Sequence, residues 1–379
     1  MIPHCLPERP GRPPLPLRNG LRAALIFLTA ILFGSPLPAE SREGTGTFSI
    51  VARDAATGEV GVAVQSRVFG VGPRVAWVKA GAGAIATQAY SNETFGPNGL
   101  SLMEAGHSAT ETLELLLAPD KDRDQRQVGI IDATGQAANW TGSACMDWAG
   151  DSLGFEFSCQ GNILASAEVV AGMARAFMET EGEELALRLI AALDAAQAAG
   201  GDKRGQQSAA ILIGRLHPDY PEYSTRYVDI RVEDHTTPIA ELRRLYEIYE
   251  GQGLVQAHLR FADWKEASGD SAGARFERAR VGDVLGRVLA GNSQDADLLN
   301  SLAWFTAIND VYLTQALDAA KRAAALEPEN SGILDTLAEV YFRLGNKEEA
   351  LKVEMRALEL SPKDAYLKEQ IARFKGEAP

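Results

Sequence analysis

The feature that most limits the possible folds of this chain is a 34-residue repeat near its C-terminal end. Most matching positions keep this spacing, and one further pair, Leu302 and Leu337, matches with one residue of slippage in the turn between two expected helices. A fixed period of this length is typical of stacked helix-turn-helix units. We therefore expect an all-helical region over residues 251–379, in which residues 255–292 form a degenerate earlier unit. The matching positions of the repeat are Ala316 and Ala350, Leu317 and Leu351, Arg322 and Arg356, Ala323 and Ala357, and Pro328 and Pro362.

A 34-residue helix-turn-helix unit whose second helix ends at a proline resembles the tetratricopeptide repeat. The resemblance implies a stack of helices with a concave groove that holds a peptide or a partner protein. The alternative is that the repeats only cap or dimerise the domain before them, so a homo-oligomer stays open beside a peptide or protein partner.

Residues 47–250 alternate between two kinds of periodicity. Runs of strands are separated by pairs of helices, which does not fit the strict β-α-β alternation of a parallel sheet. The order predicts an α+β fold, a four-layer αββα sandwich in which two mostly antiparallel sheets face each other and helices cover the outside. The expected strands are 47–53, 60–64, 75–79, 84–89, 127–132, 137–141, 155–160, 207–214 and 226–232, and the expected helices are 99–105, one from 108, 167–179, 183–198 and one from 238.

Residues 1–39 have the layout of a secretory signal peptide, since four arginines precede an apolar run over residues 23–33 and small residues follow up to Ala39. The run is shorter than the roughly 20 residues that span a bilayer. We expect export to the periplasm or the extracellular space without stable membrane insertion, and an uncleaved membrane anchor is the alternative. Residues 40–46 would then be a pro-segment or linker.

Charge and cysteine content bear on partners and cofactors. The net charge of −14 repels phosphate backbones, so we expect no nucleic-acid partner. Cys145 and Cys159 either pair in an oxidising compartment or stay as buried free thiols, and both readings are open. Because no histidine accompanies them at metal-ligand spacing, we expect no metal site and no cofactor.

Small polar clusters at strand ends supply the candidate site. In the loop over residues 200–208, Asp202 and Arg204 bring opposite charges between glycines, directly before a strand. Loops of this kind at a sheet edge often carry function, although a solvated turn is the alternative. The other candidates at strand ends are Ser66, Gln88, Gln160, Asn162, Gln207 and Ser208.

Six ordered blocks of the sequence look like successive parts of the bacterial domain of unknown function 1028, which is placed in the Ntn-hydrolase (N-terminal nucleophile) superfamily. The resemblance spans about residues 47–248 and implies the same αββα sandwich, but it implies no particular substrate. The blocks are TFSIVARDAATGEVGVAVQS, GAIATQAYSNETFGPNGLSLM, RQVGIIDATGQAANWTGSAC, CQGNILAS, AGGDKRGQQSAAIL and RYVDIRVEDHTTPIAELRRL.

The superfamily resemblance gives Thr47 a role. In Ntn hydrolases the first residue of the mature domain is Thr, Ser or Cys, and its side chain attacks an amide carbonyl while its own α-amine takes the proton. Such an amine titrates near about 8 and is a usable base at neutral pH. A cut between Gly46 and Thr47 is therefore required. We predict an exported amidohydrolase that acts on a small amide or peptide bond with Thr47 as nucleophile. If the bond stays intact, the chain is a non-catalytic exported scaffold or assembly protein whose repeats carry the function.

The remaining candidates receive roles by position. Asn162 or nearby backbone amides would form an oxyanion hole. Asp202 would orient the nucleophile, and Arg204 would pair with Asp202 or bind a substrate carboxylate through its two parallel donors. The expected substrate-binding residues are Ser49, which lies on the same strand face as Thr47, together with Ser66, Gln88, Gln160, Gln207 and Ser208.

Overall fold

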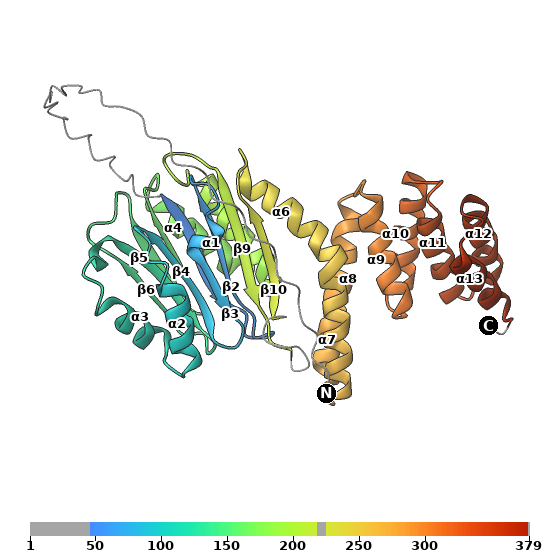
Figure 1. The fold of residues 1–379 in the computed structure, drawn as a ribbon, viewed down its shortest axis with the longest axis horizontal. Coiled ribbons are helices and arrows are strands. Elements are labelled where there is room, and N and C mark those ends of the chain that lie inside the picture. The colour runs from blue at the N-terminus through green and yellow to red at the C-terminus, as the bar shows by residue number, and fades with distance from the viewer. Residues whose placement is uncertain (1–45, 218–224, 378–379) are drawn as a thin grey trace, which may run out of the picture. The chain divides into compact units, whose positions relative to one another are not determined.

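A computed structural model describes residues 46–217 and 225–377 of the chain (Figure 1). The expected signal peptide and all of the expected pro-segment except Gly46 lie outside the described residues.

The described part of the N-terminal region contains two antiparallel sheets (Figure 1). The 6-stranded sheet has the order β10-β9-β2-β1-β8-β7, and the 4-stranded sheet has the order β3-β4-β5-β6. The strands are β1 (Thr47–Arg53), β2 (Val60–Ser66), β3 (Ala76–Lys79), β4 (Gly83–Ala89), β5 (Arg126–Asp132), β6 (Ala137–Thr141), β7 (Gly150–Gly154), β8 (Phe157–Asn162), β9 (Ser208–Gly214) and β10 (Arg226–Val232).

Apolar side chains bury both faces of the sheets. Between the sheets, Val62 and Val64 of β2 pack with Ala84 and Ala86 of β4. The outer face of the larger sheet packs on α4 (Glu168–Glu179), α5 (Leu185–Ala198) and α6 (Pro238–Tyr249). The outer face of the smaller sheet packs on α2 (Phe95–Glu104) and α3 (Ala109–Leu117). The N-terminal region therefore combines sheets and helices, as the sequence predicts.

Three local differences from the sequence prediction have simple causes. Strand β7 was missed because its sequence, GDSLG, has no apolar alternation and forms only the edge of the sheet. The short helix α1 (Gly72–Val75) was also missed, being one turn long. Helix α2 begins at Phe95 rather than at residue 99, because a proline at position 97 is tolerated within a first helical turn. The capping box predicted at Ser108 and Glu111 is present at the start of α3.

From α6 onward the described chain is all helical, as predicted. A π-helical turn (Glu250–Leu254) joins α6 to α7. No helix among the described residues is long and apolar enough to cross a bilayer. The later helices are α7 (Val255–Ala267), α8 (Ser271–Ala290), α9 (Ala296–Ile308), α10 (Leu313–Leu326), α11 (Ser331–Arg343), α12 (Lys347–Leu360) and α13 (Ala365–Lys375).

The sequence repeat corresponds to a structural repeat. Ala316 and Ala350 are both fully buried, on α10 and α12. The turn before α10 covers residues 309–312, whereas the turn before α12 covers residues 344–346, which accounts for the slippage of one residue. Asp310 and Gly345 occupy the same place in these turns, and both have positive φ angles, of 53° and 81°.

A buried ion cluster joins the larger sheet to helices α7 and α8. Arg215, just after β9, donates through Nη1 to Glu59 at 3.2 Å and through Nη2 to Glu277 of α8. His258 of α7 lies 2.8 Å from Glu277 and 3.4 Å from Glu184. Burial raises the pKa of Glu59 to about 7. Burial would also raise the pKa of Glu277, but the hydrogen bond with His258 and the charge of Arg215 hold it at about 2.

Among the described residues, Cys145 and Cys159 are free thiols, so the disulfide that the sequence left open is not formed. Cys159 is fully buried among the apolar side chains between the larger sheet and α4 and α5, and burial raises the pKa of its thiol. The thiol of Cys145 donates instead to the carbonyl oxygen of Arg126 at 3.4 Å.

Candidate functional site

The space between the two sheets is apolar at one end and polar at the other. Alternate residues of a strand share a face, so Thr47 and Ser49 precede Val51 on one face of β1. Thr47 lies opposite Ser66 of β2 and opposite Asn162 of β8. We call the following set the polar end; none of its members is more than 1% exposed: Thr47, Ser49, Ser66, Gln88, Gln127, Ser158, Gln160 and Asn162.

Two glutamines of the polar end, Gln88 and Gln160, hold the backbone and side chains of β1. Gln88 donates through Nε2 to the carbonyl oxygen of Thr47 at 3.3 Å and to Gln127 Oε1 at 2.9 Å. Ser49 donates to Gln88 Oε1 at 2.6 Å, and Gln160 donates to the Ser49 hydroxyl at 2.7 Å. Because these buried groups satisfy one another, Ser49, Gln88 and Gln160 position the start of β1 rather than present free groups to a ligand.

The peptide bond between Gly46 and Thr47 has polar groups on both sides. The Thr47 hydroxyl donates to Ser66 Oγ at 3.0 Å, and the Ser66 hydroxyl donates to the carbonyl oxygen of Gly46. Arg204 donates through Nη2 to the same carbonyl oxygen at 2.9 Å. The carbonyl therefore accepts from two donors, one of them charged, which draws electrons away from its carbon atom.

The loop that carries Asp202 and Arg204 is held against this peptide bond. Gly200 and Gly201 take positive φ angles of 108° and 54°, which glycine adopts at least cost. They turn the chain so that Asp202 forms an isolated antiparallel bridge with Leu164, just after β8. The sequence-based pairing of Asp202 with Arg204 is present as a salt bridge, with Nη2 and Oδ2 2.8 Å apart.

Asp202 is one of the most constrained side chains in the site. Asp202 as a whole is 3% exposed to solvent. Its Oδ1 accepts from the backbone N–H and Nε of Arg204, at 2.9 and 3.1 Å. Its Oδ2 accepts from Arg204 Nη2 at 2.8 Å and from the backbone N–H of Arg67 at 3.2 Å. Four donors fill the lone-pair positions of a carboxylate, so this side chain is fixed in place.

Not every predicted site residue lies at the Gly46–Thr47 bond. The side-chain amide of Asn162 donates to Gln127 Oε1 at 2.9 Å, whereas Ser66 and Arg204 donate to the Gly46 carbonyl. Gln207 donates to Asp234 at 3.0 Å. Ser208 donates to the carbonyl oxygen of Val68 at 2.6 Å. Gln207 and Ser208 thus hold neighbouring loops.

Sequence reasoning missed Gln127 as a participant in the site. Gln127 links Gln88 to Asn162 and also donates to the carbonyl oxygen of Gly161 at 2.8 Å. A signal was present, since Gln127 lies on the same face of β5 as the buried Ile131 and opposite Gln88 in register.

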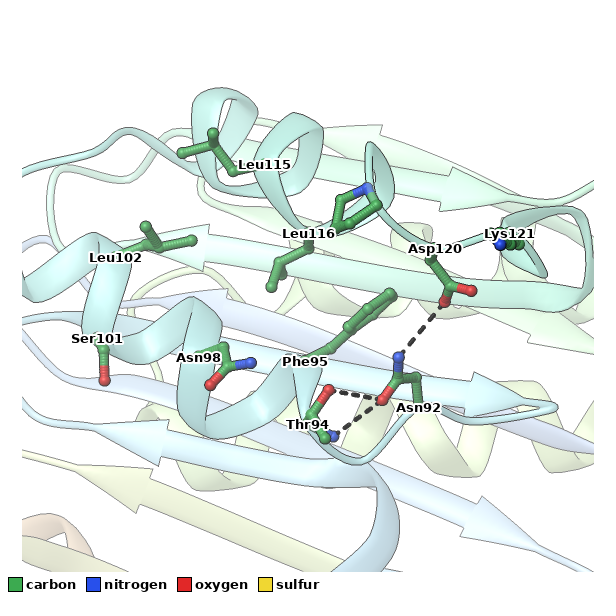
Figure 2. A pocket seen from close by; sticks show the side chains of 11 residues that line it. Asn92, Thr94, Phe95, Asn98, Ser101, Leu102, Leu115, Leu116, Asp120 and Lys121 are labelled. Carbon is green, nitrogen blue, oxygen red and sulfur yellow. Dashed lines mark hydrogen bonds between the residues drawn. The ribbon is translucent and has the colours of Figure 1, made fainter.

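A separate cavity of about 860 Å³ lies beside α2 and α3 (Figure 2). Phe95, Leu102 and Leu116 give it an apolar lining. Three of its polar residues bind one another, since Asn92 donates to Asp120 at 3.4 Å and accepts from the Thr94 hydroxyl at 2.7 Å. The cavity shares no lining residue with the polar end. Across the described residues, no group of three or more His, Cys, Asp or Glu side chains is placed to hold a metal ion.

Comparison with known proteins identifies a family for the N-terminal region. A family described as "Family of unknown function (DUF1028)" matches residues 47–242. Among curated proteins, the comparison found no match. A crystal structure of a DUF1028 protein from Silicibacter pomeroyi is 32% identical, covers 54% of this chain and 89% of that one, and has a TM-score of 0.49.

Other solved structures match over the helical region. The first tetratricopeptide domain of Spaghetti (RPAP3), bound to an HSP90 peptide, is 16% identical, covering 33% of this chain and 93% of that one, with a TM-score of 0.23. The MamA protein is 18% identical, covering 32% of this chain and 83% of that one, with a TM-score of 0.23.

Proposed function

Because the chain belongs to the DUF1028 family, whose function is unknown, we propose an activity from the Gly46–Thr47 site itself. The protein is an Ntn-type hydrolase that cuts its own chain before Thr47 and then cleaves small amide or peptide bonds with that residue. One observation carries the proposal. The Gly46 carbonyl accepts hydrogen bonds from Ser66 and Arg204, while the Thr47 hydroxyl donates to the same Ser66.

This arrangement supports an acyl shift from nitrogen to oxygen. Thr47 Oγ1 bonds to the carbonyl carbon of Gly46, and its proton passes to Ser66 Oγ. Ser66 gives its own proton to the carbonyl oxygen, so the tetrahedral adduct forms without a separated charge. Arg204 stabilises the negative charge that develops on that oxygen, a contribution of about 3 kcal/mol for one such donor elsewhere.

The adduct then breaks the bond between the Gly46 carbon and the Thr47 nitrogen. The proton on the adduct oxygen moves to this nitrogen, which leaves an ester on Thr47 and a free α-amine. Water hydrolyses the ester and releases the carboxyl group of residue 46. The new amine then serves as the base for the Thr47 hydroxyl when a substrate amide is attacked.

The packing of the N-terminal region supports the same assignment. Two sheets face each other across an apolar core, and helices pack on the outer face of each sheet. We take these layers to be the αββα sandwich of Ntn hydrolases. Thr47 begins β1, a central strand of the larger sheet. The roles assigned by position change accordingly: Ser66 and Arg204 take the oxyanion role expected of Asn162, and Asp202 positions Arg204.

Export and partner binding belong to the same proposal. The signal-like layout of residues 1–39 supports export, which fractionation of the producing cells would check. The paired helices from α7 to α13 support a module that binds a peptide or a protein in its groove.

N-terminal sequencing and intact-mass measurement of the purified protein test the proposal. We expect the wild-type chain to start at Thr47, the Thr47→Ala variant to keep residues before position 47, and the Thr47→Ser variant to be cut. A wild-type chain that keeps Gly46 attached contradicts the hydrolase. It favours the alternative from the sequence, an exported scaffold whose function lies in the repeats.

A further inference from the structure

The α-carbon of Gly46 lies directly against the carboxylate of Asp202. A Cβ atom built on Gly46 would lie 2.7 Å from Oδ1, 2.8 Å from Oδ2 and 2.9 Å from Cγ of Asp202. Non-bonded carbon and oxygen atoms do not approach this closely without one of them moving. Any L-residue other than glycine at position 46 therefore requires Asp202 to shift.

Asp202 has no easy way to shift. Its side chain is fully buried, and the four donors from Arg204 and Arg67 fill both of its oxygens. Moving the carboxylate would also move Arg204, which holds the Gly46 carbonyl at 2.9 Å. The Asp202 carboxylate blocks a substituent on the α-carbon, and the Arg204 guanidinium polarises the carbonyl. These two groups therefore form one rigid unit.

The constraint applies to substrates as well as to the chain itself, and this step rests on the proposed function. The ester formed during self-cleavage is an acyl group, that of residue 46, bound to Thr47 Oγ1. A substrate amide attacked by the same oxygen gives the same kind of ester, with its own α-carbon in the place of the Gly46 α-carbon.

We propose that the site selects amides whose acyl α-carbon carries two hydrogen atoms and therefore no branch, that is, glycyl peptides and amides of acids that are unbranched at this carbon. Asp202 is the specificity-determining residue. Its carboxylate, whose oxygens already accept four hydrogen bonds, excludes the side chain of alanine and of every larger L-residue at the acyl position.

The test is a matched set of acetyl-dipeptide coumarin amides on the purified, processed protein: acetyl-Gly-Gly and acetyl-Gly-Ala, with hexanoyl amide as the unbranched arm. We expect kcat/KM for the glycyl and hexanoyl amides to exceed that for the alanyl amide by at least about tenfold, because overpacking of a rigid site costs about 1–3 kcal/mol. The Asp202→Ala variant should be slower on all three amides and should lose most of the preference for glycine over alanine.

The outcomes separate the specificity from the hydrolase. If the processed protein cleaves the alanyl amide as fast as the glycyl amide, the specificity assigned to Asp202 is wrong, whereas the proposed hydrolase activity is supported. If a chain that starts at Thr47 cleaves none of the three amides, the inferred substrate class is wrong and the processed nucleophile remains. If the chain keeps Gly46 and cleaves none of the amides, the proposed hydrolase activity is contradicted, and so is the specificity that rests on it.

Discussion

Arg204 binds Asp202 through both carboxylate oxygens, with Nε 3.1 Å from Oδ1 and Nη2 2.8 Å from Oδ2. The same Nη2 donates to the Gly46 carbonyl. Lysine keeps the positive charge but not the planar set of donors, so we expect Arg204→Lys to slow self-cleavage about a hundredfold, as loss of one oxyanion donor does. Time-resolved mass spectrometry of newly made protein measures the rate. Arg67→Ala is the control, because that partly exposed side chain donates only to the carbonyl of Gln206 among the contacts described.

Two buried serines that lie opposite each other on β2 and β9 allow a matched comparison. Ser66 contacts Thr47 and Gly46, whereas Ser208 binds the backbone of Val68 and Val71. We expect Ser66→Ala to block the proton transfer and leave most chains uncut. Ser208→Ala should lower the melting temperature and still be cut at its N-terminus. Equal cutting in both variants would remove Ser66 from the mechanism.

Arg215 gives a prediction about stability. Its side chain is 2% exposed and contacts Glu59 and Glu277. Removal of one partner from a buried charge cluster leaves the others unpaired, at a cost of about 3–5 kcal/mol. We expect Arg215→Met to lower the free energy of unfolding by about that amount in urea denaturation. Arg226→Met is the control, because the Arg226–Asp229 pair is exposed and such pairs contribute little.

Glu354 makes the stability of the last repeat depend on pH. The residue is fully buried on α12, against the carboxyl group of Asp335 on α11. Burial, and then the charge of Asp335 on α11, raise its pKa from 4.5 to about 8, while Arg373 on α13 opposes this weakly. The folded chain therefore holds the proton more tightly than the unfolded chain, and its stability falls as pH rises from about 4.5 to about 8.

Hydrogen exchange of α11 and α12, corrected for intrinsic rates, measures this dependence. We expect protection in the wild type to decrease between pH 5 and pH 8, a window that lies between the ordinary pKa of Glu354 and its raised pKa. Glu354→Gln should reduce the dependence, because the amide does not titrate, whereas the neighbouring Asp335, whose pKa burial raises to about 6, still does. Glu348→Gln, an exposed position on the same helix, should leave it unchanged. A wild-type profile without slope would show that Glu354 is not buried as an acid.

Local sequence patterns predicted the helices and strands, but they did not predict the contacts between residues far apart in the sequence. Alternation placed Thr47 and Ser49 on one face of β1, and the repeat placed Ala316 and Ala350 in equivalent buried positions. Both patterns are local or periodic, so they can be read from a single sequence. The bond from Arg204 to the Gly46 carbonyl joins residues 158 positions apart. No spacing rule links them, because the pairing of β1 with β2 and of β2 with β9 brings them together.

The same limit explains the assignments that changed. Asn162 lies opposite Thr47, at the start of β1. Its amide is used by Gln127, which comes from the other sheet. Several polar side chains lie at one strand end, and the packing of the two sheets decides which of them reaches a given carbonyl. The sequence of either strand alone does not carry that information.

Gly46→Ala tests the geometry of the cleavage bond within the chain itself. A methyl group at this position meets the fixed carboxylate of Asp202 at 2.7 Å, so either the carboxylate or the peptide bond must move, and both movements draw the carbonyl away from Arg204 and Ser66. We expect self-cleavage to slow by at least about tenfold, since overpacking a rigid site costs about 1–3 kcal/mol. Gly44→Ala, the same change in the preceding Gly-Thr step of the sequence, is the matched control and should be cut at the wild-type rate. If Gly46→Ala is cut as fast as the wild type, Asp202 yields to a side chain, and it then neither fixes Arg204 nor selects the acyl group of a substrate.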